Sequence, residues 1–159
     1  VGLEFIEEVG LGNIHDRVQA LTGWLISRLL ELRHSSGQPL VTLYGPASTE
    51  ARGGTVTLNL RDGRGELIDH QVIEERAGER RMSIRAGCFC NPGAGEMAMG
   101  ISADEMKSCF IRLSDRLTYD EFRRCIDGKS TGAVRISLGM ASTFADVSAF
   151  VDFARSFLE

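Results

Sequence analysis

Apolar residues recur every three or four positions at both ends of the chain, which is the spacing of amphipathic helices. Residues 1–9 predict a short helix of this kind that stops at Gly10. After it we expect a long helix with Asn13 as its N-cap and its end near His34. Its apolar stripe consists of Val18, Leu21, Leu25, Leu29 and Leu32.

Three short sequences have the form of a capping box, in which a hydroxyl residue precedes an acidic residue by three positions. They are Ser102 to Glu105, Thr118 to Glu121, and Thr143 to Asp146. Each predicts the first turn of a helix. The helix that follows Thr143 has a predicted buried stripe made of Val147, Phe150, Val151, Ala154 and Phe157.

Between these helices lie short runs rich in β-branched residues and bounded by glycine or proline, the pattern of strands. We expect strands over residues 40–44, 55–60, 82–85 and 132–138, and a helix over 67–78. Residues 93–100 are rich in glycine and methionine and are expected to be mobile. The predicted fold class is therefore α/β, of the two-layer α+β kind. It is a single domain over residues 1–159, with a small mixed sheet of about four strands covered by helices.

Composition narrows the possible partners and compartments. The net charge is −4 and shows no basic excess, so nucleic acid is not an expected partner. No apolar run is long enough to span a membrane, and the acidic first residues do not resemble a signal peptide. The four cysteines are expected to be free thiols in a reducing cytoplasm. The chain begins at Val1, inside a helical pattern, which suggests a piece of a longer protein.

The segment Ser83–Gly93 is the candidate for chemistry, because it places Cys88 and Cys90 ahead of an Asn-Pro-Gly turn. A turn exposes its side chains, and a thiol near a guanidinium such as that of Arg85 becomes a better nucleophile. Cysteine also packs readily in protein cores. Packing suits Cys109 and Cys125, which lie in apolar helical contexts, better than it suits Cys90.

Other chemistry at these residues is less well supported by spacing. Structural zinc prefers pairs of cysteines two to four residues apart, and the three histidines form no ligand pattern, so no metal is expected. A redox pair normally has two intervening residues. The loop around Lys129 lacks the spacing of a phosphate-binding motif. Arg135 lies in the middle of a predicted strand, where it binds a carboxylate, lies on a solvated face of the sheet, or forms a structural ion pair.

The sequence motifs Arg85–Ala94 and Gly132–Gly139 resemble motifs in the C-terminal small domain of pyridoxal-phosphate enzymes with the class V aminotransferase fold. Within that class the chain is most similar to the cysteine desulfurase-like domain of molybdenum cofactor sulfurases. Supporting matches are Asn13–His15, Leu21–Leu25 and Leu43–Pro46. The similarity extends over essentially the whole chain.

The resemblance implies a role for each site residue. Cys90 corresponds to the thiol that attacks the sulfur of a cysteine substrate and carries it as a persulfide, and Arg135 to the arginine that binds the substrate carboxylate. Cys88 stands where other desulfurases have histidine, and it either relays sulfur or shapes the loop. Arg85, Gly87 and Asn91 are expected to support the loop.

The resemblance also implies what this chain lacks. The lysine that holds pyridoxal phosphate belongs to the large domain, and neither Lys107 nor Lys129 matches it, so no cofactor is expected on this chain alone. The complete protein is expected to be a cytoplasmic homodimer that uses L-cysteine or a related amino acid, with the sulfur acceptor open. Two alternatives remain: another class V enzyme, such as a lyase, epimerase or transaminase, or a stand-alone sulfur-carrier or interaction module.

Overall fold

The computed structural model describes residues 2–87, 92–112, 118, 121, 124–126 and 132–159. A four-stranded sheet in the order β1-β2-β4-β3 forms its centre. The strands are β1 (Val41–Tyr44), β2 (Thr55–Leu60), β3 (Arg85–Gly87) and β4 (Ala133–Ser137). The α/β two-layer prediction is confirmed, although all three strand pairings are antiparallel where a mixture of directions was expected.

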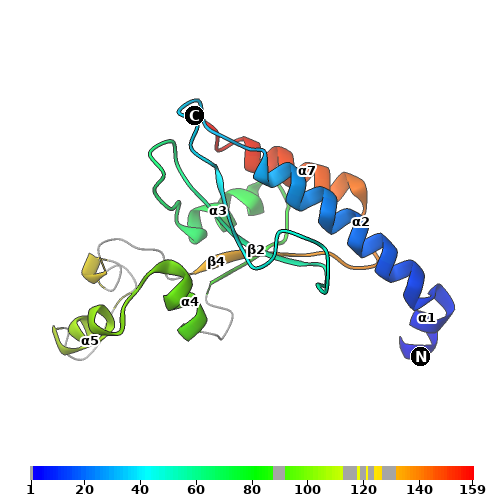
Figure 1. Cartoon of the computed structure of the whole chain (residues 1–159), viewed down its shortest axis with the longest axis horizontal. Coiled ribbons are helices and arrows are strands. Elements are labelled where there is room, and N and C mark those ends of the chain that lie inside the picture. The colour runs from blue at the N-terminus through cyan, green and yellow to red at the C-terminus, as the bar shows by residue number, and fades with distance from the viewer. Residues whose placement is uncertain (1, 88–91, 113–117, 119–120, 122–123, 127–131) are drawn as a thin grey trace.

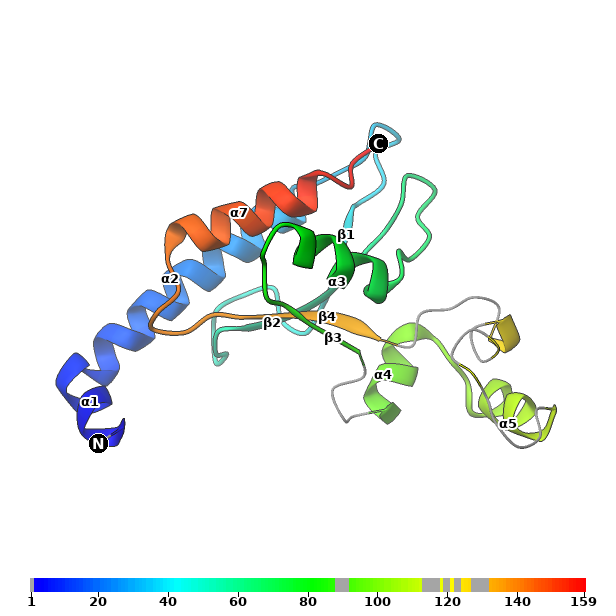
Figure 2. The same ribbon diagram turned by 180° about the vertical axis from the view of Figure 1, so that it is seen from behind.

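Helices α2 (Leu11–Leu30), α3 (His70–Glu79) and α7 (Phe144–Arg155) cover one face of this sheet (Figures 1 and 2). The stripe predicted for α7 is buried throughout, and Trp24 of α2 packs edge-on against Phe144 with ring centroids 4.6 Å apart. Apolar side chains from one side of β1, β2 and β4 complete this core. Among the described residues, no helix is long and apolar enough to cross a membrane.

Several helix boundaries differ from those predicted. Helix α1 (Gly2–Val9) is followed by Gly10, which has a positive φ of 91° and is the N-cap of α2. Asn13 is therefore inside α2, and the prediction that it caps the helix was wrong. Its side-chain amide donates to the Val9 carbonyl across the break between the two helices.

Two further elements begin later in the chain than the sequence predicts. Helix α3 begins only at His70, because the Asp69 side chain accepts from the Gln71 N–H and caps it. The strand expected at 82–85 is formed instead by Arg85–Gly87. All three capping boxes have the predicted reciprocal hydrogen bonds.

Outside the main core, α4 (Pro92–Met99) and α5 (Ala103–Arg112) form a smaller unit beyond one end of the sheet (Figure 2). The sequence predicted a mobile segment where α4 lies. A second apolar cluster holds this unit together, built on Ile101, Cys109 and Ile126 with Met99 and Met106 packed against it.

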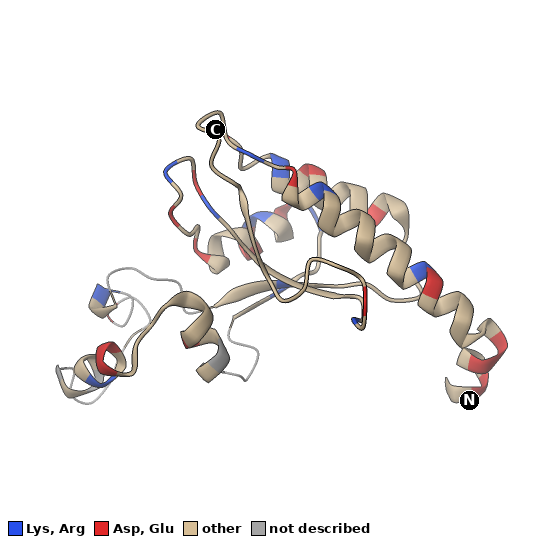
Figure 3. Ribbon diagram, viewed as in Figure 1, with Lys and Arg blue, Asp and Glu red and all other residues tan. Residues whose placement is uncertain are grey.

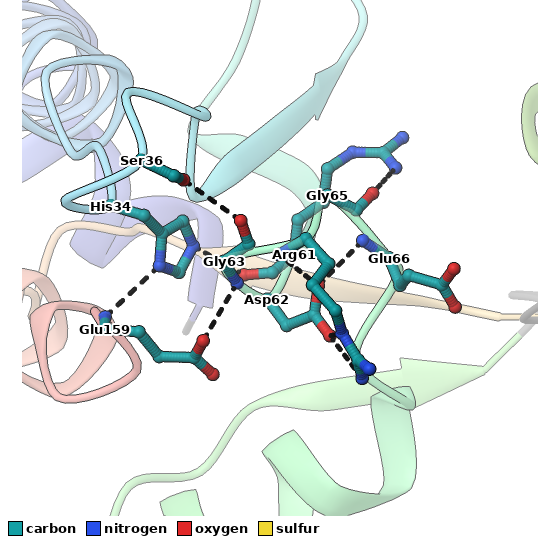
Figure 4. Close-up of polar contacts among 9 residues, drawn as sticks. His34, Ser36, Arg61, Asp62, Gly63, Gly65, Glu66 and Glu159 are labelled. Atoms are coloured by element: carbon teal, nitrogen blue, oxygen red, sulfur yellow. Dashed lines mark hydrogen bonds and ion pairs between the residues drawn. The ribbon is translucent and has the colours of Figure 1, made fainter.

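The C-terminal residue is fastened to two loops of the main unit (Figure 4). The Glu159 N–H donates to Nδ1 of the buried His34, and the Glu159 carboxylate accepts from the Gly63 N–H. His34 in turn donates from Nε2 to the Arg61 carbonyl over 2.9 Å. The contacts join the α2–β1 connection to the loop that follows β2.

Candidate functional site

The face of the sheet opposite α2, α3 and α7 is polar, and it is called the polar face below. Because side chains alternate along a strand, every second residue points away from the helices. In β2, Val56, Leu58 and Leu60 belong to the core, so Thr57 and Asn59 lie on the polar face. The strand pairings place Thr42, Tyr44, Arg85 and Arg135 on the same face.

Two predicted site residues meet on this face. The register of β3 and β4 puts Arg85 directly opposite Arg135, where paired side chains start about 4.5–5.5 Å apart. Arg85 is exposed and Arg135 is half-buried. A guanidinium binds a carboxylate through two parallel hydrogen bonds, so this doubly positive position suits a carboxylate ligand.

Strand β3 leads from this arginine pair directly to the cysteine loop. Its last residue, Gly87, has a φ of 119°, a conformation that favours glycine. The three other predicted site residues, Cys88, Cys90 and Asn91, lie outside the described residues. The structure therefore brings together Arg85, Gly87 and Arg135 and gives no position for the thiols.

A cluster that the sequence did not predict lies beside this pair. Asn59 is fully buried, and the two hydrogens on its Nδ2 are shared among three acceptors: the Gly132 carbonyl at 3.2 Å, the Tyr44 hydroxyl at 3.2 Å and the Met99 sulfur at 3.4 Å. The Tyr44 hydroxyl donates to the same sulfur at 3.3 Å. The signal in the sequence was Asn59 itself, a polar residue between Leu58 and Leu60 in a strand.

Burial changes the acidity of the tyrosine in this cluster. Desolvation raises the pKa of Tyr44 above its usual value of 10.0, and the hydrogen bond from Asn59 and the charge of Arg61 offset only part of that rise. The phenol is therefore neutral at physiological pH and can donate to Met99.

The prediction of free thiols was wrong for two cysteines. Cys109 and Cys125 form a disulfide, with Cα atoms 5.7 Å apart. Cys109 is fully buried in the second apolar cluster, and Cys125 packs against that cluster. Both side chains suit an apolar environment, as predicted, but the fold of the smaller unit also brings their sulfur atoms together.

The described part of this chain does not fit pyridoxal phosphate by itself. That cofactor is held through a lysine, and of the two lysines Lys107 is an exposed residue of α5, in the smaller unit, whereas Lys129 lies outside the described residues. The arginine pair suits the carboxylate of a substrate.

Charged residues of both signs are interspersed over the described part of the chain, with acidic residues gathered on α1 (Figure 3).

The fold of the chain is shared with a solved structure. The apo structure of a cysteine desulfurase from Thermococcus onnurineus NA1 superposes with a TM-score of 0.62 at 17% identity. The match covers 99% of this chain and 29% of the desulfurase.

Sequence comparisons identify the family. The chain is 34% identical to molybdenum cofactor sulfurase of Solanum lycopersicum and 32% identical to that of Homo sapiens, covering 98% and 96% of this chain. It spans less than a fifth of those relatives, 18% and 17% of their lengths. The family model for class V aminotransferases matches residues 1–150. The sequence motifs, the fold and the family match point to the same assignment, and the chain belongs to the class V aminotransferase family.

Proposed function

We propose that this chain is the small C-terminal domain of a pyridoxal-phosphate-dependent enzyme that takes sulfur from L-cysteine or a related amino acid. The observation that carries the proposal is the pairing of Arg85 with Arg135 on the polar face, at the strand that leads into the loop of Cys90. Similarity to proteins named molybdenum cofactor sulfurase supports the same assignment. The large domain, with its cofactor lysine, would be supplied by the remaining length of the complete protein.

In this proposal Arg135 binds the substrate carboxylate and so orients the substrate, with Arg85 supporting the loop that follows it. The Cys90 thiolate attacks the substrate sulfur. A sulfur–sulfur bond forms, the carbon–sulfur bond of the substrate breaks, and the carbon fragment gains a proton and leaves as alanine. The enzyme keeps the sulfur as a persulfide on Cys90. The large domain would hold pyridoxal phosphate, which would supply stabilisation of negative charge on the substrate carbon.

The test uses the complete protein loaded with cofactor. We expect incubation with L-cysteine to add one sulfur to Cys90, mapped by peptide mass spectrometry without reductant, and to release an equal amount of alanine. Cys90→Ser abolishes the added sulfur. Cys88→Ser, two residues away in the same loop, separates a relay role from a shaping role for Cys88.

Two results would contradict the proposal. One is a normal persulfide yield in Cys90→Ser. The other is a cofactor-loaded wild-type protein that forms no persulfide, which favours a class V enzyme without sulfur chemistry.

The carboxylate role of Arg135 has a separate test. Lysine keeps the positive charge and loses the two-pronged hydrogen bond, so Arg135→Lys is expected to raise KM for cysteine about tenfold or more with a smaller change in kcat. An unchanged KM would remove Arg135 from the substrate site.

A further inference from the structure

We propose that Asn59 is a positioning residue for this reaction. Within segment 88–132, which contains Cys90, its buried amide ties Met99 at the end of α4 to Gly132, which leads into the strand of Arg135. This inference rests on the proposed function, because it assigns Asn59 to the geometry of sulfur transfer. Asn59 itself is fully buried on β2 and is not proposed to contact the substrate.

One side-chain amide joins three elements. Asn59 Nδ2 lies within 3.4 Å of acceptors from β1, from the end of α4 and from the residue before β4, namely the Tyr44 hydroxyl, the Met99 sulfur and the Gly132 carbonyl. A carbonyl oxygen can only accept, so Gly132 decides which end of the Asn59 amide faces the cluster. The Tyr44 hydroxyl extends the network by donating to Met99.

The Met99 contact acts on the cysteine loop through α4. This helix begins at Pro92, two residues after Cys90, and ends at Met99. An eight-residue helix is about 12 Å long and moves as one body. Holding Met99 against Tyr44 and Asn59 therefore restrains α4, whose first residue is two positions after Cys90.

The Gly132 contact acts at the other end of the segment. A Cβ on Gly132 would lie 2.8 Å from the Gly87 Cα and 2.8 Å from Cε1 of His70, so the chain returns to the sheet in close contact with the residue from which it left. Arg135 lies three residues further along β4. Asn59 thus joins the end of α4, the helix that follows Cys90 in the sequence, to the residue that leads into the strand of Arg135.

The amide oxygen of Asn59 indicates that the residue does more than stabilise the fold. Among the described residues, Oδ1 is buried and has no hydrogen-bond partner. A buried polar atom in that condition is unfavourable and calls for an explanation. The contacts of Nδ2 provide one, because an aliphatic side chain would fill the space without tying Met99 to Gly132.

The experiment uses the complete, cofactor-loaded protein with Asn59→Ala and Asn59→Leu. We expect the single-turnover rate of persulfide formation on Cys90 to fall about ten- to hundredfold, since small displacements of reacting groups have effects of that size. KM for cysteine should stay within about threefold, because Arg135 is untouched. Amide hydrogen exchange over residues 92–99 should become faster.

Val56→Ala is the control, because Val56 lies on the same strand but on the core face. It is expected to lower the thermal midpoint while leaving the persulfide rate within about twofold. Equal rate losses in Asn59→Ala and Val56→Ala at equal loss of stability would overturn the proposal. Amide exchange over residues 92–99 that is as slow in the Asn59 variants as in the wild type would overturn it as well.

Tyr44→Phe and Met99→Leu keep side-chain volume and serve if the Asn59 variants fail to fold. Each removes one partner of the network. Each should therefore speed amide exchange over residues 92–99 and lower the rate of persulfide formation about three- to tenfold. If both match the wild type in rate and exchange, the proposal fails. A wild-type protein that forms no persulfide would refute the proposed function instead, and the exchange measurement, which needs no turnover, would still test the anchor.

Discussion

Gly132 lies where the chain returns to β4, close to Gly87 at the end of β3. A Cβ atom at this position would lie 2.8 Å from the Gly87 Cα and 2.8 Å from Cε1 of His70, so only glycine fits without a shift of its neighbours. Gly132→Ala is expected to destabilise the chain by about 1–3 kcal/mol, because backbone and a buried ring must both shift. The measurement is urea denaturation. Gly139→Ala is the control, since a Cβ there meets nothing within 4 Å, and equal midpoints for the two variants would contradict the prediction.

Tyr44 makes a prediction about alkaline pH. Burial raises the pKa of its phenol above 10.0 in the folded chain, so folding favours the neutral form. The resulting stabilisation is fully present below pH 10.0 and is lost as the pH rises through the folded-state pKa. Phenolate absorbance, titrated in wild type and in Tyr44→Phe, isolates Tyr44 from the second tyrosine, Tyr119. If Tyr44 instead ionises at or below pH 10.0, its hydroxyl is not held in a buried site.

Residue-level patterns revealed some of the site and missed the rest for a physical reason. Arg135 stood out because a guanidinium interrupts an apolar strand, and Gly87 because it precedes the cysteines. Tyr44 and Met99 looked like an ordinary strand residue and an ordinary apolar residue. Their contact joins positions 55 residues apart, and no local periodicity encodes a pairing of that separation.

At the scale of the element, the capping box of α7 links helix stability to acid. Hydrogen bonds from the Thr143 side chain and then its backbone N–H lower the pKa of Asp146 below its usual 3.8. A lowered carboxyl pKa gives stability that is present above pH 3.8 and is lost as the pH falls through the folded-state value.

We therefore expect Thr143→Ala to lower the thermal midpoint at neutral pH by about 2–4 °C. The difference from wild type should shrink as the pH falls below the usual pKa of Asp146. Thermal scans at several pH values test this. A difference that stays constant into strong acid would mean that Asp146 takes no part in the cap.

The disulfide between Cys109 and Cys125 is a second stabilising element. It closes a loop with a sequence separation of 16, for which the chain-entropy model gives about 3 kcal/mol. Cys125→Ser should speed amide exchange across α5 and leave α7, which belongs to the main core, unchanged. Peptide mapping without reductant checks the bond itself. Unchanged exchange in α5 would show that the apolar cluster suffices without the cross-link.

Elements with strong local signals were predicted well, and those that depend on distant contacts were not. The capping boxes and the stripe of α7 follow from spacing within one turn or one helix, and both are confirmed. Helix α4 has the sequence PGAGEMAM, in which glycine disfavours helix. Its contacts through Met99 with β1 and β2 favour the helix, and they are invisible to a local pattern.

At the scale of the whole molecule, His34 and Glu159 join segments that are 125 residues apart (Figure 4). His34→Ala would leave the Arg61 carbonyl without its buried donor and the Glu159 N–H without its acceptor. The expected loss is about 1–3 kcal/mol in denaturant unfolding.

Asp152→Ala is the control for that variant. It breaks an ion pair with Arg155 in which both side chains are more than half exposed, and it should cost less than about 1 kcal/mol. If His34→Ala proves as mild as this surface variant, the contacts drawn in Figure 4 do not hold the C-terminal residue in place.

The pairing of Gly87 with Ala133 has a consequence for how this domain can vary. The chain leaves the sheet at one position and re-enters it beside the same position, so residues 88–132 form an insertion between two hydrogen-bonded neighbours. The entropy of closing such an excursion grows only slowly with its length. Changes in the length of the part that follows Met99 are therefore expected to leave the sheet and the pairing of Arg85 with Arg135 in place.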